Sequence, residues 1–165
     1  SSRYARLMQL VIGSDHAGFH LKADIVAHVV AQGHEVVDIG TDSTESVDYP
    51  DFGAQVGHAV VDGRAELGIA ICGSGIGICM AAGKVHGVRA ATIHDVTSAR
   101  MSRRHNDANV MCLGERFTGV QVALDAVDAF LSTEFEGGRH QRRVDKISAI
   151  DGRGPAVDPS TQGAH

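Results

Sequence analysis

Short apolar runs alternate with longer segments of mixed polarity along most of this chain. Five of the runs are rich in Val, Ile, Leu and Ala, and each ends close to a glycine or to polar residues. Uninterrupted apolar runs of this length are typical of strands that are buried on both faces of a parallel sheet. We therefore predict five strands, at Gln9–Ile12, His34–Ile39, Leu67–Cys72, Val88–Ile93 and Asn109–Leu113.

The segments between these strands repeat apolar residues every three or four positions, the spacing of a helix that buries one face. The first has Leu21, Ile25 and Val29 on one stripe and Gly33 at its expected end. Helices are predicted after Gly18, over Phe52–Val61, from the glycines at 73–77 to Gly83, and over Ser98–Arg104, Val120–Leu131 and Arg139–Ile150. Strands and helices that alternate with short connections predict an α/β fold, with a parallel doubly wound sheet and helices on both faces.

Composition narrows the class of protein. With 165 residues, a hydrophobic fraction of 43% and 20 glycines, the chain suits one compact α/β domain with many tight turns. The net charge of −5 argues against non-specific nucleic-acid binding, and no apolar run approaches the roughly 20 residues of a membrane span. Three cysteines without the spacing of a disulfide framework favour reduced thiols in a cytoplasmic protein, and the start of the sequence shows no secretory leader.

The sequence divides simply along its length. We expect a ragged N-terminus over 1–7, a single domain over 8–150, and a disordered tail over 151–165, where Gly, Pro, Ser and Asp replace the periodic apolar residues. The sequence shows no internal repeat and no second apolar core.

The strand at Leu67–Cys72 runs into a loop with three alternating glycines, Gly73, Gly75 and Gly77. Glycines let the backbone turn sharply and approach a ligand closely, and the N–H groups of such a loop can hold an anion or a developing oxyanion. Cys72 stands at the carboxyl end of the strand, where ligands bind in open α/β sheets. The residues alone leave open a tight turn with a buried, inert cysteine, and a dinucleotide loop, although the spacing G-x-G-x-G departs from the dinucleotide pattern.

Other polar clusters also follow strands, so we expect them at the same edge of the sheet. They are Asp15-His16 after the first strand, His94-Asp95 after the fourth and Arg116 after the fifth. The first cluster suits an acid–base pair, half of a metal site, or only a polar turn. Two cysteines have no partner at metal-ligand spacing and are expected in the core; these are Cys79 and Cys112.

Two further clusters lie on predicted helices. His105 and Asn106 close the helix after the fourth strand, where they either cap the helix or contact a ligand. Arg139 and Arg143 lie four residues apart on the last helix and therefore share one face. Two guanidinium groups on one face suit a phosphate, and the alternative is a solvated basic face.

Five motifs together resemble one known family. They are GSDHAGF at 13–19, DYP at 48–50, CGSGIG at 72–77, RHNDAN at 104–109 and EGGRHQRR at 136–143. Over about 8–150, in this order and without a large gap, the sequence resembles ribose-5-phosphate isomerases of the B type, whose wider group includes the galactose-6-phosphate isomerase subunits. Any one motif is weak evidence, whereas five in register are highly specific.

The resemblance implies a Rossmann-like, three-layer αβα sandwich with a five-stranded parallel sheet. It also implies a homodimer, sometimes paired into a tetramer, with active sites at the subunit interface. The implied activity is metal-free interconversion of D-ribose 5-phosphate and D-ribulose 5-phosphate, a step of the pentose phosphate pathway. The implied ligand is a small sugar phosphate, with no cofactor and with neither nucleic acid nor membrane as a partner.

The family's catalytic roles carry over to matching positions of this chain. Cys72 becomes the base that moves a proton between C2 and C1, because Ile76-Gly77-Ile78 stands where some members carry a glutamate base. Ser74 becomes a proton relay between the substrate oxygens. The loop amides that hold the enediolate oxygen would be those of Gly73, Gly75, Ile76 and Gly77.

The resemblance also assigns ring opening and binding. His105, assisted by Asp15, would open the sugar ring, and Asn106 would hold a substrate hydroxyl. The pocket wall and the phosphate contacts would come from Tyr49, His16, Arg116, Arg139 and Arg143. His94 is not part of the family pattern.

Three rival functions stay open at this point. The same chemistry could act on another sugar, such as allose 6-phosphate or galactose 6-phosphate. A metal-dependent isomerase or hydrolase could use Asp15-His16 and His94-Asp95 as ligands. A protein of this fold could also bind a sugar phosphate or a nucleotide without turnover.

Overall fold

The computed structural model describes residues 6–153. The strands are β1 (Gln9–Ser14), β2 (Glu35–Ile39), β3 (Leu67–Cys72), β4 (Ala90–Thr92) and β5 (Val110–Gly114). The α-helices are α1 (Phe19–Ala31), α2 (Tyr49–Val61), α3 (Gly77–Gly83), α4 (Val96–Asn106), α5 (Val120–Ser132) and α6 (Arg139–Ser148). A short 3-10 turn, His16–Gly18, precedes α1, and a wider turn, Ala149–Arg153, follows α6.

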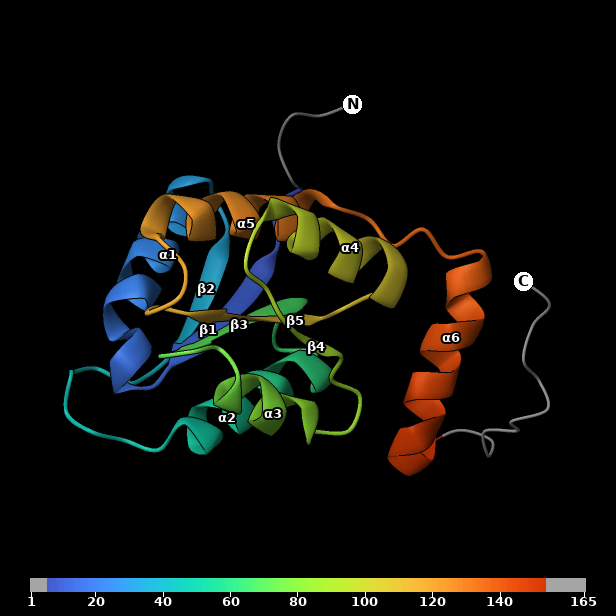
Figure 1. Ribbon diagram of the computed structural model, residues 1–165, viewed down its shortest axis with the longest axis horizontal. Helices are drawn as coiled ribbons and strands as arrows, with labels where there is room; N and C mark the ends of the chain where they lie inside the picture. The colour runs from blue at the N-terminus through green and yellow to red at the C-terminus, as the bar shows by residue number, and fades with distance from the viewer. Residues whose placement is uncertain (1–5, 154–165) are drawn as a thin grey trace.

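The five strands form one sheet in the order β2-β1-β3-β5-β4, and all neighbouring pairs are parallel. Helices α1, α4 and α5 cover one face, and α2 and α3 cover the other (Figure 1). The predicted three-layer α/β sandwich with a five-stranded parallel sheet is confirmed.

The central strand β3 is buried at every position, which explains why its sequence is apolar without interruption. Ile69 and Ile71 pack into the layer of α1, α4 and α5, whereas Ala70 and Cys72 belong to the layer of α2 and α3. At Gly68, a Cβ atom would lie only 2.8 Å from a methyl group of Val56. The small residue therefore lets α2 approach the sheet closely.

Several elements begin or end away from their predicted limits, and local hydrogen bonds explain why. Helix α4 begins at Val96 rather than Ser98, because the Asp95 carboxylate and the Ser98 side chain form a capping box at its start. Helix α2 begins before Phe52, since Pro50 suits the first turn of a helix. Strand β4 is shorter than predicted, because the Val88 N–H group bonds within a turn.

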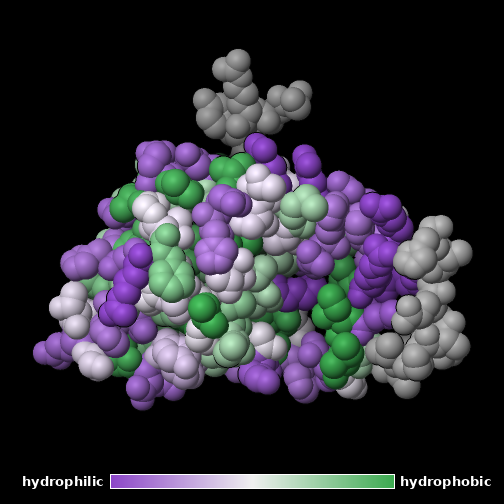
Figure 2. Space-filling view, in the orientation of Figure 1, coloured by the Kyte–Doolittle hydropathy of each residue, from purple (hydrophilic) through white to green (hydrophobic). Residues whose placement is uncertain are grey.

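Helix α6 stands apart from the sheet, and its main contacts in the described chain are with the end of α4 and with the turn that follows it (Figure 1). His140 and Val144 are its buried residues. Ile147 and Ile150 at its far end are 44% and 76% exposed. Figure 2 shows apolar side chains on this part of α6 beside a hollow that separates it from the rest of the molecule. One face of α6 therefore has no partner among residues 6–153.

Contacts reach both ends of the described chain. Arg6 forms an ion pair with Glu66, and the Asp151 carboxylate accepts a hydrogen bond from the Gly87 N–H group at 2.8 Å. Most of the predicted ragged start, residues 1–5 of 1–7, and most of the predicted tail, residues 154–165 of 151–165, lie outside the described residues. Among residues 6–153, no helix combines the length and the apolar character that a membrane span requires.

Candidate active site

A cavity of about 590 Å³ opens at the carboxyl ends of β1, β3 and β5. The predicted site residues that line it are Asp15, His16, Tyr49, Cys72, Gly73, Ser74, Ile76, Gly77 and Arg116. The carboxyl edge is where ligands bind in open α/β sheets. The expectation that residues following different strands meet at this edge therefore agrees with the structure.

The glycine loop holds the sulfur of Cys72. Cys72 is buried, and the Gly75 N–H group donates a hydrogen bond to its Sγ at 3.2 Å. Gly75 has a φ of +76°, a conformation that glycine adopts without strain. Its carbonyl accepts a hydrogen bond from Thr92 Oγ1 at 3.1 Å. The backbone donor is aimed at the sulfur, where it stabilises negative charge.

Thr92 was missed by the sequence reasoning. It is the last residue of β4, so it stands at the same edge of the sheet as Cys72. Its place at the end of a strand was the signal that the sequence offered, but threonine has no strongly reactive group that would have distinguished Thr92 from other strand residues. Its role is to orient the loop through the Gly75 carbonyl.

Asp15 and His16 are both fixed by backbone groups. Asp15 Oδ1 accepts hydrogen bonds from the Ala17 and Gly18 N–H groups at 2.9 and 3.1 Å, so the carboxylate caps the short turn before α1. His16 Nδ1 accepts the Val47 N–H group at 3.1 Å. This bond places the ring proton of a neutral His16 on Nε2. His16 can therefore offer an N–H donor to a ligand.

The loop after β5 is bound to the loop after β3. The N–H groups of Glu115 and Arg116 donate to the carbonyls of Cys72 and Gly73, at 2.9 and 3.0 Å. The Glu115 carboxylate also accepts the Leu21 N–H group in the first turn of α1, at 2.6 Å. These bonds keep the Arg116 side chain beside the glycine loop at the cavity wall.

Gly75 does not line the cavity but bonds to the Cys72 sulfur beside it, whereas four other predicted residues lie elsewhere in the chain and none of the four lines the cavity. They are His105, Asn106, Arg139 and Arg143. His105 and Asn106 end α4, and Arg139 begins α6. Asp107 closes α4 in a left-handed conformation with φ +47°, so His105 and Asn106 are not needed to end the helix.

The rings of His105 and His140 stack at the junction of α4 and α6. Their centroids lie 4.2 Å apart and their planes differ by 12°. A carboxylate oxygen of Glu136 lies 3.6 Å from His140 Nε2 and 4.0 Å from His105 Nε2. Two imidazoles and a carboxylate are a donor set that zinc accepts. The parallel rings, however, aim their lone pairs side by side, so one ion could be bound only if the stack opened.

The rival metal site at His94-Asp95 is not supported, because the Asp95 carboxylate has a structural partner. It accepts the Ser98 N–H group at 2.6 Å. This bond, together with the Ser98 hydroxyl, lowers the pKa of Asp95 below its usual value. Asp95 therefore acts as the N-cap of α4.

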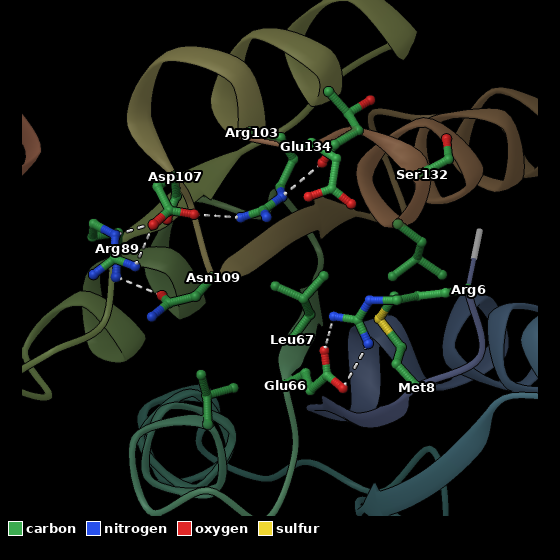
Figure 3. A pocket seen from close by; sticks show the side chains of 13 residues that line it. Arg6, Met8, Glu66, Leu67, Arg89, Arg103, Asp107, Asn109, Ser132 and Glu134 are labelled. Carbon is green, nitrogen blue, oxygen red and sulfur yellow. Dashed lines mark hydrogen bonds and ion pairs between the residues drawn. The ribbon is translucent and has the colours of Figure 1, made fainter. Parts of the chain in front are cut away.

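A second cavity, of about 630 Å³, lies at the opposite, amino edge of the sheet (Figure 3). Its charged side chains are largely paired with one another: Arg6 with Glu66, and both Arg89 and Arg103 with Asp107. Arg103 also donates to the Ala108 carbonyl at 2.6 Å. These pairs tie loops together. The hydroxyls that line the cavity, those of Ser132 and Thr133, donate to carbonyls of α5, and the cavity does not lie at the edge where ligands bind in such sheets.

Comparison with known proteins gives the family. The model of the ribose/galactose isomerase family matches residues 10–147. This chain belongs to that family. It is 48% identical over 147 residues to ribose-5-phosphate isomerase B of Escherichia coli, an alignment that covers 89% of this chain and 99% of that protein.

Solved structures of the family agree with this assignment. Clostridium thermocellum ribose-5-phosphate isomerase B is 53% identical with a TM-score of 0.87, and the match covers 88% of this chain and 99% of that one. The Mycoplasma genitalium ribose-5-phosphate isomerase B, solved with bound ribulose-5-phosphate, is 43% identical with a TM-score of 0.84, covering 88% and 97% of the two chains.

Gly114 tests how tightly the two loops must fit. A Cβ atom there would overlap the Ser74 backbone, so Gly114→Ala should displace the glycine loop from β5. A misplacement of about 1 Å costs on the order of 100-fold in rate, and we expect a loss of that size in kcat/KM on ribose 5-phosphate. Gly119→Ala is the matched control, because its Cβ would meet nothing within 4 Å. Equal activity of the two variants would show that the loop position is not critical.

Proposed function

We propose that this chain is an aldose–ketose isomerase that interconverts D-ribose 5-phosphate and D-ribulose 5-phosphate. The observation that carries the proposal is the buried sulfur of Cys72, held by a backbone N–H group at the wall of a cavity that Asp15, His16 and Arg116 also line. The names of the relatives support it, since one is a ribose-5-phosphate isomerase B and another binds ribulose-5-phosphate. The proposed reaction moves only protons, so it calls for neither a metal nor an organic cofactor.

In the proposed reaction, the Cys72 thiolate removes the proton from C2 of the open-chain aldose. The electrons of that bond form an enediolate, whose negative charge lies on O1. Ser74, which lines the cavity, relays the O2 hydroxyl proton to O1. Cys72 then returns its proton to C1, which leaves a ketone at C2. The N–H groups of the loop at 73–77 would stabilise the enediolate as an oxyanion hole.

The aldose enters mainly as a closed ring, so ring opening needs an acid and a base of its own. We assign it to His105 with the assistance of Asp15, and we assign a substrate hydroxyl to Asn106. The phosphate would be bound by arginine forks and by the Nε2–H donor of His16. The arginines concerned are Arg139 and Arg143, with Arg116 as a further contact. Tyr49, whose ring packs against Gly77, would line the pocket.

These assignments require a second copy of the chain. His105 and Asn106 do not reach the Cys72 cavity of their own chain, and neither do the exposed arginines of α6. Two apolar residues at the cavity mouth, Ile76 and Met80, are 48% and 67% exposed, and α6 carries a further apolar face. We propose a homodimer in which the end of α4 and the start of α6 of the partner subunit complete each site.

The function is tested by the isomerisation of ribose 5-phosphate with protein freed of metal by a chelator. We expect robust formation of ribulose 5-phosphate. Cys72→Ala should lose about 10³-fold in kcat, the size of a general-base effect, while substrate binding and folding persist. Cys79→Ser, a change at a half-buried thiol outside the cavity, should keep wild-type turnover.

Three other outcomes would change the proposed function. Turnover of allose 6-phosphate or galactose 6-phosphate in place of ribose 5-phosphate would change the substrate. Activity that returned only with added divalent ions would overturn the metal-free reaction. Near wild-type turnover by Cys72→Ala would remove Cys72 from the role of base.

The phosphate assignment is tested on α6. Arg143→Ala and Arg139→Ala should raise KM for phosphorylated sugars by about tenfold or more, since each removes a charge-assisted contact. Arg142→Ala is the matched control, because Arg142 is equally exposed but lies about 100° around the helix from Arg143. A rise of the same size for Arg142→Ala, or an equal effect on unphosphorylated sugars, would count against a specific phosphate contact.

A further inference from the structure

The stacked pair of histidines at the α4–α6 junction has a role still to be explained. The His105 side chain is 30% exposed, whereas that of His140 is only 8% exposed. The buried ring of His140 therefore covers one face of the His105 ring, which stays partly exposed. A buried position more often holds an aliphatic side chain, so the buried imidazole at position 140 indicates a specific role.

The path of the backbone before α6 brings the two rings together. The Glu136 N–H group donates to the Arg104 carbonyl at 3.1 Å, which joins the segment before α6 to the end of α4. Gly137 and Gly138 both have positive φ, +64° and +54°, and they turn the chain into α6 at once. Val144, one turn after His140, is buried and anchors the same face of the helix. The His140 ring is thus buried on the same face of α6 as Val144 and stacked on His105.

The charges around the pair favour a neutral His140. Burial lowers the pKa of His140, and His105, Arg139 and Arg143 lower it further, against an opposing effect of Glu136. A neutral ring can stack on an imidazolium without the repulsion that a second positive charge would bring. The Glu136 carboxylate, 4.0 Å from His105 Nε2, is too distant for a direct hydrogen bond, and the His105 ring stacks on His140.

We propose that His140 is the positioning residue for His105, whose ring plane it fixes by stacking so that the His105 ring can exchange a proton with the sugar ring. This inference rests on the proposed function, because it assigns His140 to the ring-opening half of that reaction. His105 lies in the last turn of α4, where its partly exposed side chain would otherwise sample several rotamers. Proton transfer requires one of them.

The chemistry of the two substrates provides the test. Ribose 5-phosphate closes a furanose ring through its 4-hydroxyl group and must be opened before isomerisation. Ribulose 5-phosphate cannot close a furanose ring, because the 5-hydroxyl that would do so carries the phosphate. A defect confined to ring opening therefore slows the reaction from ribose 5-phosphate and spares the initial rate from ribulose 5-phosphate.

We expect His140→Ala to lower kcat on ribose 5-phosphate by about tenfold, the cost of a loosened catalytic geometry, with KM and the initial rate from ribulose 5-phosphate little changed. His140→Phe, which keeps a flat ring against His105, should recover most of the loss. Both directions are measured on one sample of the full-length protein, so their ratio does not depend on the folded fraction.

Equal losses in the two directions, or no loss for His140→Ala, would overturn the positioning role. His105→Ala separates this inference from the function on which it rests. A selective loss for His105→Ala without one for His140→Ala would leave the proposed function intact and remove only the inference. If His105→Ala slowed the reactions from ribose 5-phosphate and from ribulose 5-phosphate equally, this result would contradict the ring-opening role of His105. It would then also contradict the positioning role of His140.

Discussion

The close fit of the loop after β3 on the end of β5 is the constraint on which the site depends. Gly114 has no side chain, and the Ser74 backbone occupies the space that one would fill. This fit allows the loop after β5 to bond to the carbonyls of Cys72 and Gly73. The Gly75 N–H group is then aimed at the Cys72 sulfur. Backbone contacts of this kind fix the position of the N–H donor before a ligand binds. Donors that are preorganised in this way stabilise the charge that develops in a transition state.

The positions of the other proposed site residues depend on the turn before α6. The turn at Gly137 and Gly138 carries α6 away from the sheet and sets it against the end of α4. Near that junction lie the stacked histidines and the exposed Arg139 and Arg143, none of which lines the cavity that contains Cys72. Under the proposed function, the sheet edge and the junction of α4 and α6 would each supply half of a site, and a symmetric dimer would bring the two halves together.

Features of the fold and of the site could be predicted from the sequence where a local pattern of residues or a general rule of parallel sheets determines them. The limits of β3 were predicted correctly, because a strand buried on both faces is apolar from end to end. The grouping of Asp15, Cys72 and Arg116 followed from the rule that parallel strands share one carboxyl edge. The start of α4 was missed, since its capping box uses a serine where the common pattern has Glu or Gln.

The parts that could not be predicted depend on tertiary or quaternary packing. The stack of His105 on His140 requires the path of the chain through two glycines of positive φ, which the sequence does not determine by itself. Cys79, expected in the core, is only half-buried, and hydrogen bonds from Cys112 and Thr92 lower the pKa of its thiol to about 6. The separation of His105 and Arg143 from the Cys72 cavity emerges only from the arrangement of α4 and α6.

A mixed dimer tests most directly whether a working site combines Cys72 of one subunit with His105 of the other. Cys72→Ala and His105→Ala chains, each inactive alone on ribose 5-phosphate, are unfolded together and refolded as a mixture. Half of the dimers would then carry one intact site of two, so about a quarter of the wild-type activity should return. Activity that stayed at the level of the separate variants would contradict the shared site and would place both residues in one subunit's chemistry.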